Sequence, residues 1–298
     1  MKTKLVAVIA LIFCAFMAEA SKVEGNGNII TKEISVDNYS EIELGGNIEY
    51  SGNNFWGNRS NKKFPVFKYT HGRSASLKIT IDENLFPLLS IKSNNGRLAI
   101  RIQNGTRIKP TQYVIEGSSK TLKYLKTSGP MDFEAQNAFS EDQLEIKISG
   151  SSDVKFPHNV KLRLGEFSVS GSGDLVFADL DCKNLTSKVS GSGDITLKGK
   201  ADEARYSVSG SGDIKAYDLS VNDLSCSVSG SGDARVYAKD NMNLSVSGSG
   251  DIRYKGPANV NKSKSGSGSI QGGMGSNTHI FFNTHIIKFK KATRCDIR

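Results

Sequence analysis

The sequence is poor in the side chains that most often build metal sites and disulfide frameworks. Its 298 residues include four cysteines, four histidines and one tryptophan. The histidines (His71, His158, His279 and His285) show no HExxH or other metal-ligand spacing, and no two cysteines form a CxxC pair. Walker and Rossmann glycine motifs are also absent. These absences argue against zinc hydrolases, disulfide-stapled scaffolds and nucleotide-binding enzymes.

Long hydrophobic runs are absent except at the start of the chain. Lys2 and Lys4 precede an apolar run from Leu5 to Ala18, followed by a small-x-small motif that ends at Ala20. This pattern is typical of a Sec signal peptide over residues 1–20, and the run is too short to span a bilayer. We therefore predict export to the periplasm, the outer-membrane surface or the extracellular medium, with no transmembrane segment.

Cleavage after Ala20 would leave three cysteines, Cys182, Cys226 and Cys295, an odd number that does not support a disulfide framework. From their places in the repeat over residues 128–270, Cys182 is expected in a connecting loop and Cys226 in an inward, buried position. Lipidation at Cys14 is the alternative to cleavage after Ala20. The bulky Ile12 and Phe13 before it fit that alternative poorly.

The formal net charge is +9, and about half of the excess positive charge lies at one end of the chain. Residues 271–298 differ in composition from the rest and form a basic tail with Lys288, Lys290, Lys291, Arg294 and Arg298. A basic average can indicate nucleic-acid binding. The thin spread of charge elsewhere, the lack of a nucleic-acid motif and the predicted export favour a solvated surface and no nucleic-acid partner.

The abundant feature is a repeat of the form VSGSGDI over residues 128–270. It places aspartates at regular intervals of 18 to 21 residues, with Ser269 in the same slot of a seventh copy. A period near 20 is typical of solenoid coils. The repeated aspartates are Asp153, Asp174, Asp194, Asp213, Asp233 and Asp251.

Apolar residues stand at odd offsets from each aspartate, which places them on one face of an extended chain. Val208 and Ile214, five before and one after Asp213, are examples. The serines and the aspartate fall on the outward face, and the glycines at inward positions indicate a tight corner or closely stacked backbones. We predict an all-β fold, a parallel β-helix or β-solenoid with coils of about 20 residues.

The first part of the mature chain, residues 21–127, is also predicted to be rich in β-strands. Apolar alternation at Ile42–Tyr50, Leu77–Ile81 and Leu98–Ile102, with an Asn-Gly turn before Leu98, indicates strands and a hairpin. The segment from Asn53 to Arg73 interrupts the pattern with aromatic and basic residues and is expected to be a long protruding loop.

The combination of GNGNIITKEISVDNYSEIELGGNIEY, the DENL at Asp82 to Leu85, NNGRLAI and the serial VSGSGD ending in SGSGSI resembles a known family. This is the domain of unknown function 2807, or GIN domain, an auto-transporter adhesin head domain. The resemblance covers about Gly25 to Ile270. It implies a β-helix-like fold and an exported bacterial protein, and it supplies no catalytic residues.

Stacking would bring the repeated aspartates into a column with about 4.8 Å between neighbours, where their charges repel. Calcium could relieve this repulsion. Basic residues two positions after the aspartate, at Lys155, Lys215, Arg235 and Arg253, offer relief without a metal. We therefore expect a structural ladder with no cofactor, and a calcium ladder is the alternative.

A polar stripe of serines and aspartates could bind a glycan or a protein, and sugar sites usually add exposed aromatic rings. Phe55 and Trp56 in the expected loop are the candidate exposed aromatics. Phe156, Phe177 and Tyr254 share an inward slot and are expected in the core. Our interpretation is a non-enzymatic adhesin-like module for carbohydrate or envelope protein, of unknown oligomeric state. The alternatives are a purely structural envelope protein and a polysaccharide-active β-helix enzyme.

Overall fold

The computed structural model describes residues 21–49 and 65–273. In these ranges the regular elements are β-strands, apart from a single turn of 3₁₀ helix, η2 (Phe86–Leu88). Eighteen of the strands belong to one continuous sheet, and a separate three-stranded sheet joins β1 (Ser21–Glu24), β9 (Thr106–Lys109) and β4 (Asn47–Ile48). The predicted all-β fold is confirmed.

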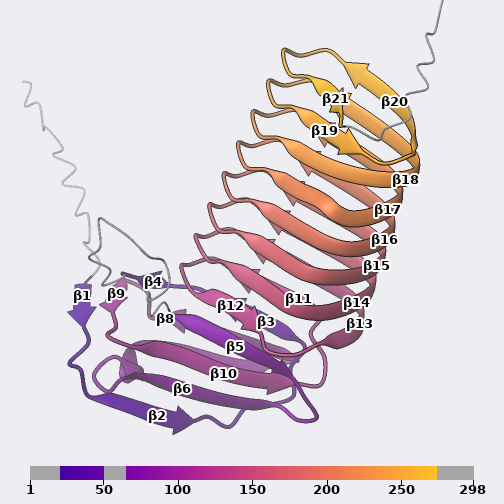
Figure 1. Cartoon of the computed structure of the whole chain (residues 1–298). Coiled ribbons are helices and arrows are strands. Elements are labelled where there is room, and N and C mark those ends of the chain that lie inside the picture. Colours follow the sequence, from indigo (N-terminus) through magenta and orange to yellow (C-terminus); the bar gives the residue numbers. More distant parts are fainter. Residues whose placement is uncertain (1–20, 50–64, 274–298) are drawn as a thin grey trace, which may run out of the picture.

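The N-terminal strands form the base of the molecule, below a stack of coils (Figure 1). The remaining N-terminal strands are β2 (Ile29–Glu33), β3 (Glu41–Leu44), β5 (Val66–His71), β6 (Ser76–Asp82), β7 (Leu89–Asn94), β8 (Arg97–Ile102), β10 (Tyr113–Ser119), β11 (Tyr124–Thr127) and β12 (Asp132–Ala135). At this base β10 pairs in parallel with β5 and antiparallel with β6, while β7 and β8 form a hairpin at the predicted Asn-Gly turn, Asn95 and Gly96.

The repeat region is a parallel solenoid of about seven coils, as predicted. Consecutive coils pair in parallel, so each repeat position lies over the same position of the next coil; Leu175, Ile195 and Ile214 are one such column. The strands are β13 (Phe139–Ile148), β14 (Val154–Val169), β15 (Leu175–Val189), β16 (Ile195–Val208), β17 (Ile214–Val228), β18 (Ala234–Val246), β19 (Ile252–Lys255), β20 (Asn259–Lys264) and β21 (Ile270–Gly272).

The core lies inside the coils and is filled by the odd-offset residues. In β17, for example, burial alternates along Ile214, Ala216, Leu224, Cys226 and Val228, all of which are buried. Aromatic rings also stack from coil to coil: the Phe156 and Phe177 ring centroids lie 4.4 Å apart with nearly parallel planes. One coil could not enclose such a core by itself, so the stack is the folding unit.

The SGSG segments form tight corners where the backbones of neighbouring coils touch. The Gly212 amide donates a hydrogen bond to the Gly191 carbonyl over 3.1 Å. A Cβ atom on Gly212 would overlap the carbonyl oxygen of Gly193 in the coil below, and the same collision recurs at the corresponding glycines of other coils. Glycine is therefore required by close backbone approach, which confirms the expectation drawn from its inward position.

Two expectations about local structure are wrong. The long loop expected from Asn53 to Arg73 does not extend over its whole length, because Val66–His71 is strand β5, with Phe67 and Tyr69 fully buried. Cys182, expected in a connecting loop, is buried within strand β15. In both places a strand continues where charged neighbours obscure its alternation of apolar and polar residues.

Candidate binding surfaces

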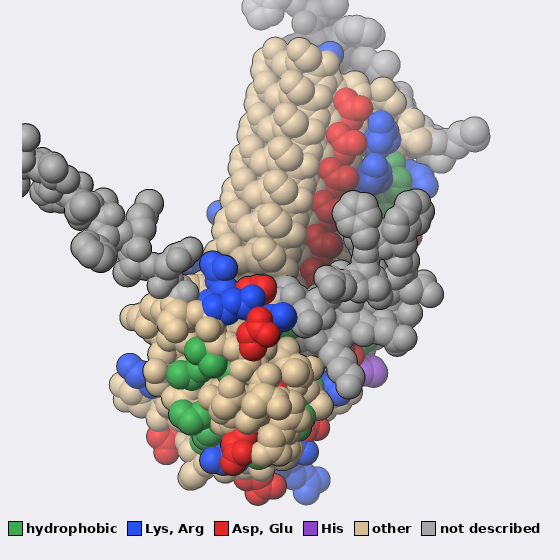
Figure 2. Space-filling model, turned by 90° about the vertical axis from the view of Figure 1, so that its left-hand side faces the viewer, with side chains coloured by type: hydrophobic (Ala, Val, Ile, Leu, Met, Phe, Trp, Pro, Cys, Tyr) green, Lys and Arg blue, Asp and Glu red, His purple; other side chains and the backbone are tan. Residues whose placement is uncertain are grey.

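The repeated aspartates form a hydrogen-bonded ladder along one edge of the solenoid (Figure 2). One carboxylate oxygen of each aspartate accepts a hydrogen bond from the backbone amide of the aspartate in the next coil. These N···O distances lie between 2.7 and 3.3 Å for Asp153, Asp174, Asp194, Asp213 and Asp233 as acceptors. The ladder ends where the amide and hydroxyl of Ser269 donate to Asp251, and these bonds lower the pKa of Asp251.

Three of the four basic side chains two positions after the aspartates connect neighbouring coils, while Lys155 pairs with Asp153 of its own coil, at 3.6 Å. Lys215 forms an ion pair with Asp194 of the preceding coil. Arg235 reaches Asp213 in the same way, at 3.6 Å, and Arg253 lies 3.6 Å from Asp233 and 3.4 Å from Asp251. These cations screen the repulsion within the column, although partly exposed ion pairs contribute little stability individually.

The ladder begins one coil earlier than the repeat motif shows. Asp132, in strand β12, accepts a hydrogen bond of 2.8 Å from the Asp153 amide. Burial raises the pKa of Asp132 to about 6; the hydrogen bond from the Asp153 amide opposes this shift, and the negative charge of Asp153 adds to it. The sequence keeps only part of the motif at this position, Ser128-Gly129 and Asp132, but its interval of 21 residues to Asp153 lies within the repeat period.

This geometry gives the aspartates a structural role, because the carboxylate of each one is hydrogen-bonded to a backbone amide of the next coil. Within residues 21–49 and 65–273, no three His, Cys, Asp or Glu side chains are grouped so that they could hold a metal ion. Calcium binding by the ladder and ligand binding by its six aspartates both remain predictions.

The aromatic candidates differ in their accessibility. Phe55 and Trp56 lie outside the described residues. Phe156, Phe177 and Tyr254 are buried, as expected from their inward slot. Tyr217 is partly exposed, and the Lys255 ammonium group lies 4.3 Å from the centre of its ring.

The two buried cysteines are unsuited to surface chemistry. Cys182 and Cys226 are free thiols inside the solenoid. Burial raises the pKa of Cys182 to about 11 and that of Cys226 to about 12, so both are protonated at neutral pH. Cys226 therefore acts as a small apolar core residue, as its position in the repeat predicted.

Two adjoining grooves follow the outer face of the solenoid. The larger has a volume of about 770 Å³, runs across β14–β18 and β20, and is lined mainly by serine, asparagine, threonine and basic side chains. The smaller, of about 350 Å³, continues toward the base past Glu145 and Tyr124. Glu166 lines both. Sequence reasoning had grouped the serines near the aspartates and missed these grooves, although the outward residues can be found from their even offsets.

No helix in the described part of the chain is long and apolar enough to cross a membrane. The fold and its surfaces define a class: a parallel β-solenoid with glycine corners, an aspartate ladder and a long polar outer face. Within this class, the chain belongs to the family described as "Putative auto-transporter adhesin, head GIN domain", whose model matches residues 63–258.

Solved structures support this assignment. A "putative lipid binding protein" from Parabacteroides distasonis is 33% identical, with a TM-score of 0.77 over 85% of this chain and 99% of its own. A "putative adhesin" from Parabacteroides merdae is 31% identical, with a TM-score of 0.75 over the same shares. Another from P. distasonis is 34% identical, with a TM-score of 0.72 over 85% of this chain and 100% of its own. No curated protein sequence matches the chain. The family and its structural neighbours support an adhesin-like role.

Proposed function

We propose that this chain is an exported, non-enzymatic adhesin-like module that binds carbohydrate or a surface protein at the cell envelope. The observation that carries the proposal is the repetition of outward-facing positions from coil to coil. A surface built in this way offers many similar contacts side by side, which suits the binding of an extended partner. The adhesin description of the family agrees with this role.

Binding is favoured over catalysis because the ladder carboxylates of the successive repeats occupy similar environments; Asp132, whose pKa is raised by burial, precedes the first repeat. A glycosidase requires two acids with different environments, so that one donates a proton while the other stays ionised. In the solenoid, by contrast, Asp174, Asp194, Asp213 and Asp233 accept the same backbone hydrogen bond in successive coils. This uniformity supports a scaffold that presents a surface.

The test is binding of the purified protein to an array of glycans and extracellular-matrix proteins, in calcium and in chelator, with lipid vesicles as a further arm. Saturable binding to one class of glycan or protein is expected. Loss of that binding in chelator would give the aspartate ladder a direct part in it. Binding to none of these by a folded protein would overturn the proposal in favour of a structural role, and release of reducing sugar ends would favour an enzyme.

Export has its own test. N-terminal sequencing of the protein recovered from the cell envelope or medium is expected to begin at Ser21, because the small-x-small motif ends at Ala20. Recovery of the protein only inside the cell, with residues 1–20 intact, would contradict this part of the proposal.

A further inference from the structure

Two straight rows of outward-facing residues cross the strands of the solenoid in continuous register. The first outer row follows the strand pairings through Glu41, Tyr124, Glu145, Glu166, Thr186, Arg205, Ser225, Asn243 and Asn261. The second outer row, two residues further along each strand, contains Lys147, Ser168, Lys188, Ser207, Ser227, Ser245 and Ser263.

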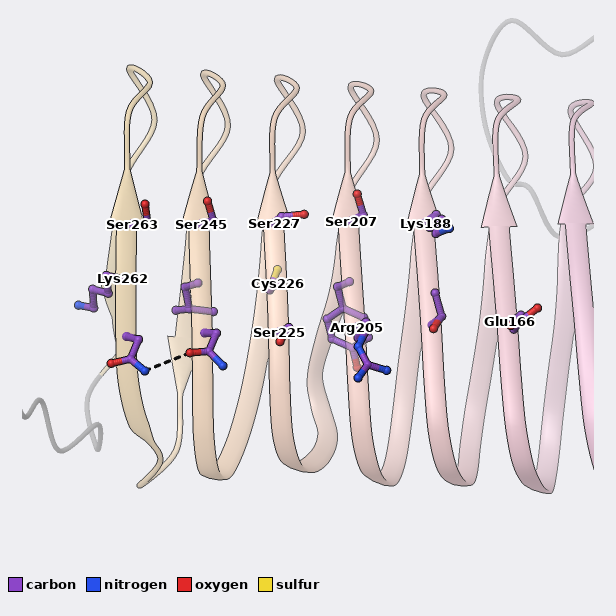
Figure 3. Close-up of a pocket in the computed structure, with 15 residues that line it drawn as sticks. Glu166, Lys188, Arg205, Ser207, Ser225, Cys226, Ser227, Ser245, Lys262 and Ser263 are labelled. Atoms are coloured by element: carbon purple, nitrogen blue, oxygen red, sulfur yellow. Dashed lines mark hydrogen bonds between the residues drawn. The ribbon is translucent and has the colours of Figure 1, made fainter.

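The larger groove lies on both rows, the smaller groove lies on the first outer row, and the two meet at Glu166 to form one long track. The first outer row makes eight strand-to-strand steps, and at about 4.8 Å per step it extends about 38 Å. Figure 3 shows Lys188, Ser207, Ser227, Ser245 and Ser263 in line across neighbouring strands, with Glu166 further toward the base. The track runs along the solenoid axis and therefore suits a linear polymer better than a compact ligand.

The floor of the larger groove carries unused hydrogen-bonding capacity. Ser207, Ser225, Ser227 and Ser245 make no side-chain hydrogen bond to any other described residue, so each hydroxyl can both donate and accept. Asn243 accepts a hydrogen bond of 3.1 Å from the side-chain amide of Asn261, and its own amide nitrogen still has protons to donate. Sugar hydroxyl groups require partners of this kind.

The charges around this floor favour an anion. In the larger groove, Lys188 and Arg205 face the single carboxylate of Glu166, while the Lys262 ammonium group lies 4.6 Å from the centre of the Tyr254 ring. The smaller groove adds Glu41 and Glu145, but each of these forms an ion pair, with Arg97 and Lys147 respectively. Within the described residues Lys188 has no ion-pair partner, and Arg205 reaches only Glu203, at 3.9 Å. A negatively charged group placed between Lys188 and Arg205 would therefore meet two basic side chains whose charges are weakly compensated.

We propose that this track binds a linear acidic polysaccharide, a chain of sugars that carry carboxylate or sulfate groups, lying along the solenoid axis. Lys188 and Arg205 would contact its anionic groups, and the serine and asparagine side chains of the floor would contact its hydroxyls. A peptide would more naturally pair with a free strand edge than cross the outer face of paired strands. This proposal rests on the proposed binding function and specifies the class of ligand that is bound.

The experiment compares binding of the whole protein to polygalacturonate, chondroitin sulfate and neutral dextran at low and at physiological salt. Acidic chains are expected to bind and dextran to bind at least tenfold more weakly, with affinity for the acidic chains falling as salt rises. The double variant K188Q/R205Q should lose tenfold or more in affinity for the acidic chains. The matched control K183Q/K239Q removes two exposed basic charges outside both grooves and should change affinity less than twofold.

A third variant, Ser227→Val, tests the floor without changing the charge. Valine suits an exposed strand position, so folding should be retained, and circular dichroism and the thermal midpoint check this for every variant. We expect at least a threefold loss of affinity. Equal losses of affinity for the acidic chains in the two double variants, or unchanged affinity in K188Q/R205Q, would show that the acidic chains do not bind at this site. If the protein binds matrix proteins or dextran but no acidic chain, the ligand class is wrong while the proposed function stands; if nothing binds, both fail.

Discussion

Asp82 joins three segments of the N-terminal part through one fully buried carboxylate. Its oxygens accept hydrogen bonds from the Gly27 amide at 2.9 Å, the Thr111 amide at 2.8 Å and the Thr111 hydroxyl at 2.6 Å. Burial opposes ionisation of this group, but the hydrogen bonds outweigh that effect and lower its pKa. The carboxylate is therefore charged in the folded protein at neutral pH and holds the segments at Gly27 and Thr111 against the end of β6.

Replacement of Asp82 with asparagine should lower the free energy of unfolding at pH 7 by about 2 kcal/mol, because buried donors lose a charged acceptor. Since the folded pKa lies below the unfolded value, the wild-type stabilisation is present above pH 4 and is lost as the pH falls below it. Urea denaturation at pH 7 and pH 3 measures both effects. Asp37→Asn, at an exposed position, is the control; a D82N protein no less stable than this control would refute the role.

For Asp132, stability depends on pH in the opposite direction. Its folded pKa of about 6 lies above the ordinary value of 3.8, so the folded state holds the proton more tightly. Asp132 therefore favours folding most below pH 4, and this contribution is lost as the pH rises through about 6. An asparagine side chain at this position would keep an acceptor for the Asp153 amide without the buried charge.

We expect D132N to raise the thermal midpoint at pH 7.5 and to flatten the dependence of stability on pH between 4 and 7. Thermal melts across that range give the measurement. D174N, at a ladder position two coils from Asp132 whose carboxylate accepts the same kind of backbone hydrogen bond, serves as the matched control and should retain the wild-type dependence. An unchanged pH profile in D132N would show that Asp132 titrates normally.

At the scale of one coil, the corner glycines limit what the repeat can accept. A methyl group on Gly212 would meet backbone atoms of Gly193 and Ser192, which cannot move without displacing their own coil. We expect Gly212→Ala to cost about 3 kcal/mol, at the upper end of overpacking effects. Gly72→Ala is the control, because its added Cβ would find the nearest atom at 3.6 Å. Urea midpoints compare the two, and similar midpoints would contradict the stacking argument.

The repeat was predictable because the same requirement, an apolar side chain in the core or a glycine at a corner, recurs at the same offset in every coil. The inward column through Val208 and Val228 and the glycine corners could be deduced from period and parity alone. Strand β5 could not, since the alternation of Phe67 and Tyr69 follows a segment rich in basic and aromatic residues. Asp132 was missed because Pro130 and Met131 replace the second half of the SGSG motif before it, although its spacing from Asp153 fits the repeat. Its ladder role became visible with the pairing of β12 with β14.

The grooves required the three-dimensional structure for a different reason. Their even offsets predict that Arg205 and Ser225 point outward. They do not predict that small serine side chains between larger ones leave a groove on the surface. Nor does the sequence show that β11 and β3 continue the same row, because about 80 residues separate these paired strands along the chain. Contacts between residues that are distant in sequence therefore cannot be predicted from local sequence patterns.

The whole molecule is a one-dimensional stack in which each coil contacts its neighbours, so its stability should vary along the axis. At the base, β12 pairs with both β5 and β14, whereas β21, in the last coil described, pairs with β19 alone. A coil with one neighbour has fewer hydrogen bonds to break before it opens. Local opening should therefore begin at the end that carries β20 and β21.

We expect amide hydrogen exchange to be slowest in β14–β17 and to become faster through β18 toward β20 and β21, with rates that differ at least tenfold between the centre and that end. Exchange followed by mass spectrometry on peptic peptides gives the gradient. G212A supplies an internal comparison, because a weakened corner between β16 and β17 should increase exchange from that coil outward and leave β5, β6 and β10 unchanged. Uniform exchange along the wild-type solenoid would mean that the stack opens only as a unit, and that the end coil is held as firmly as the centre.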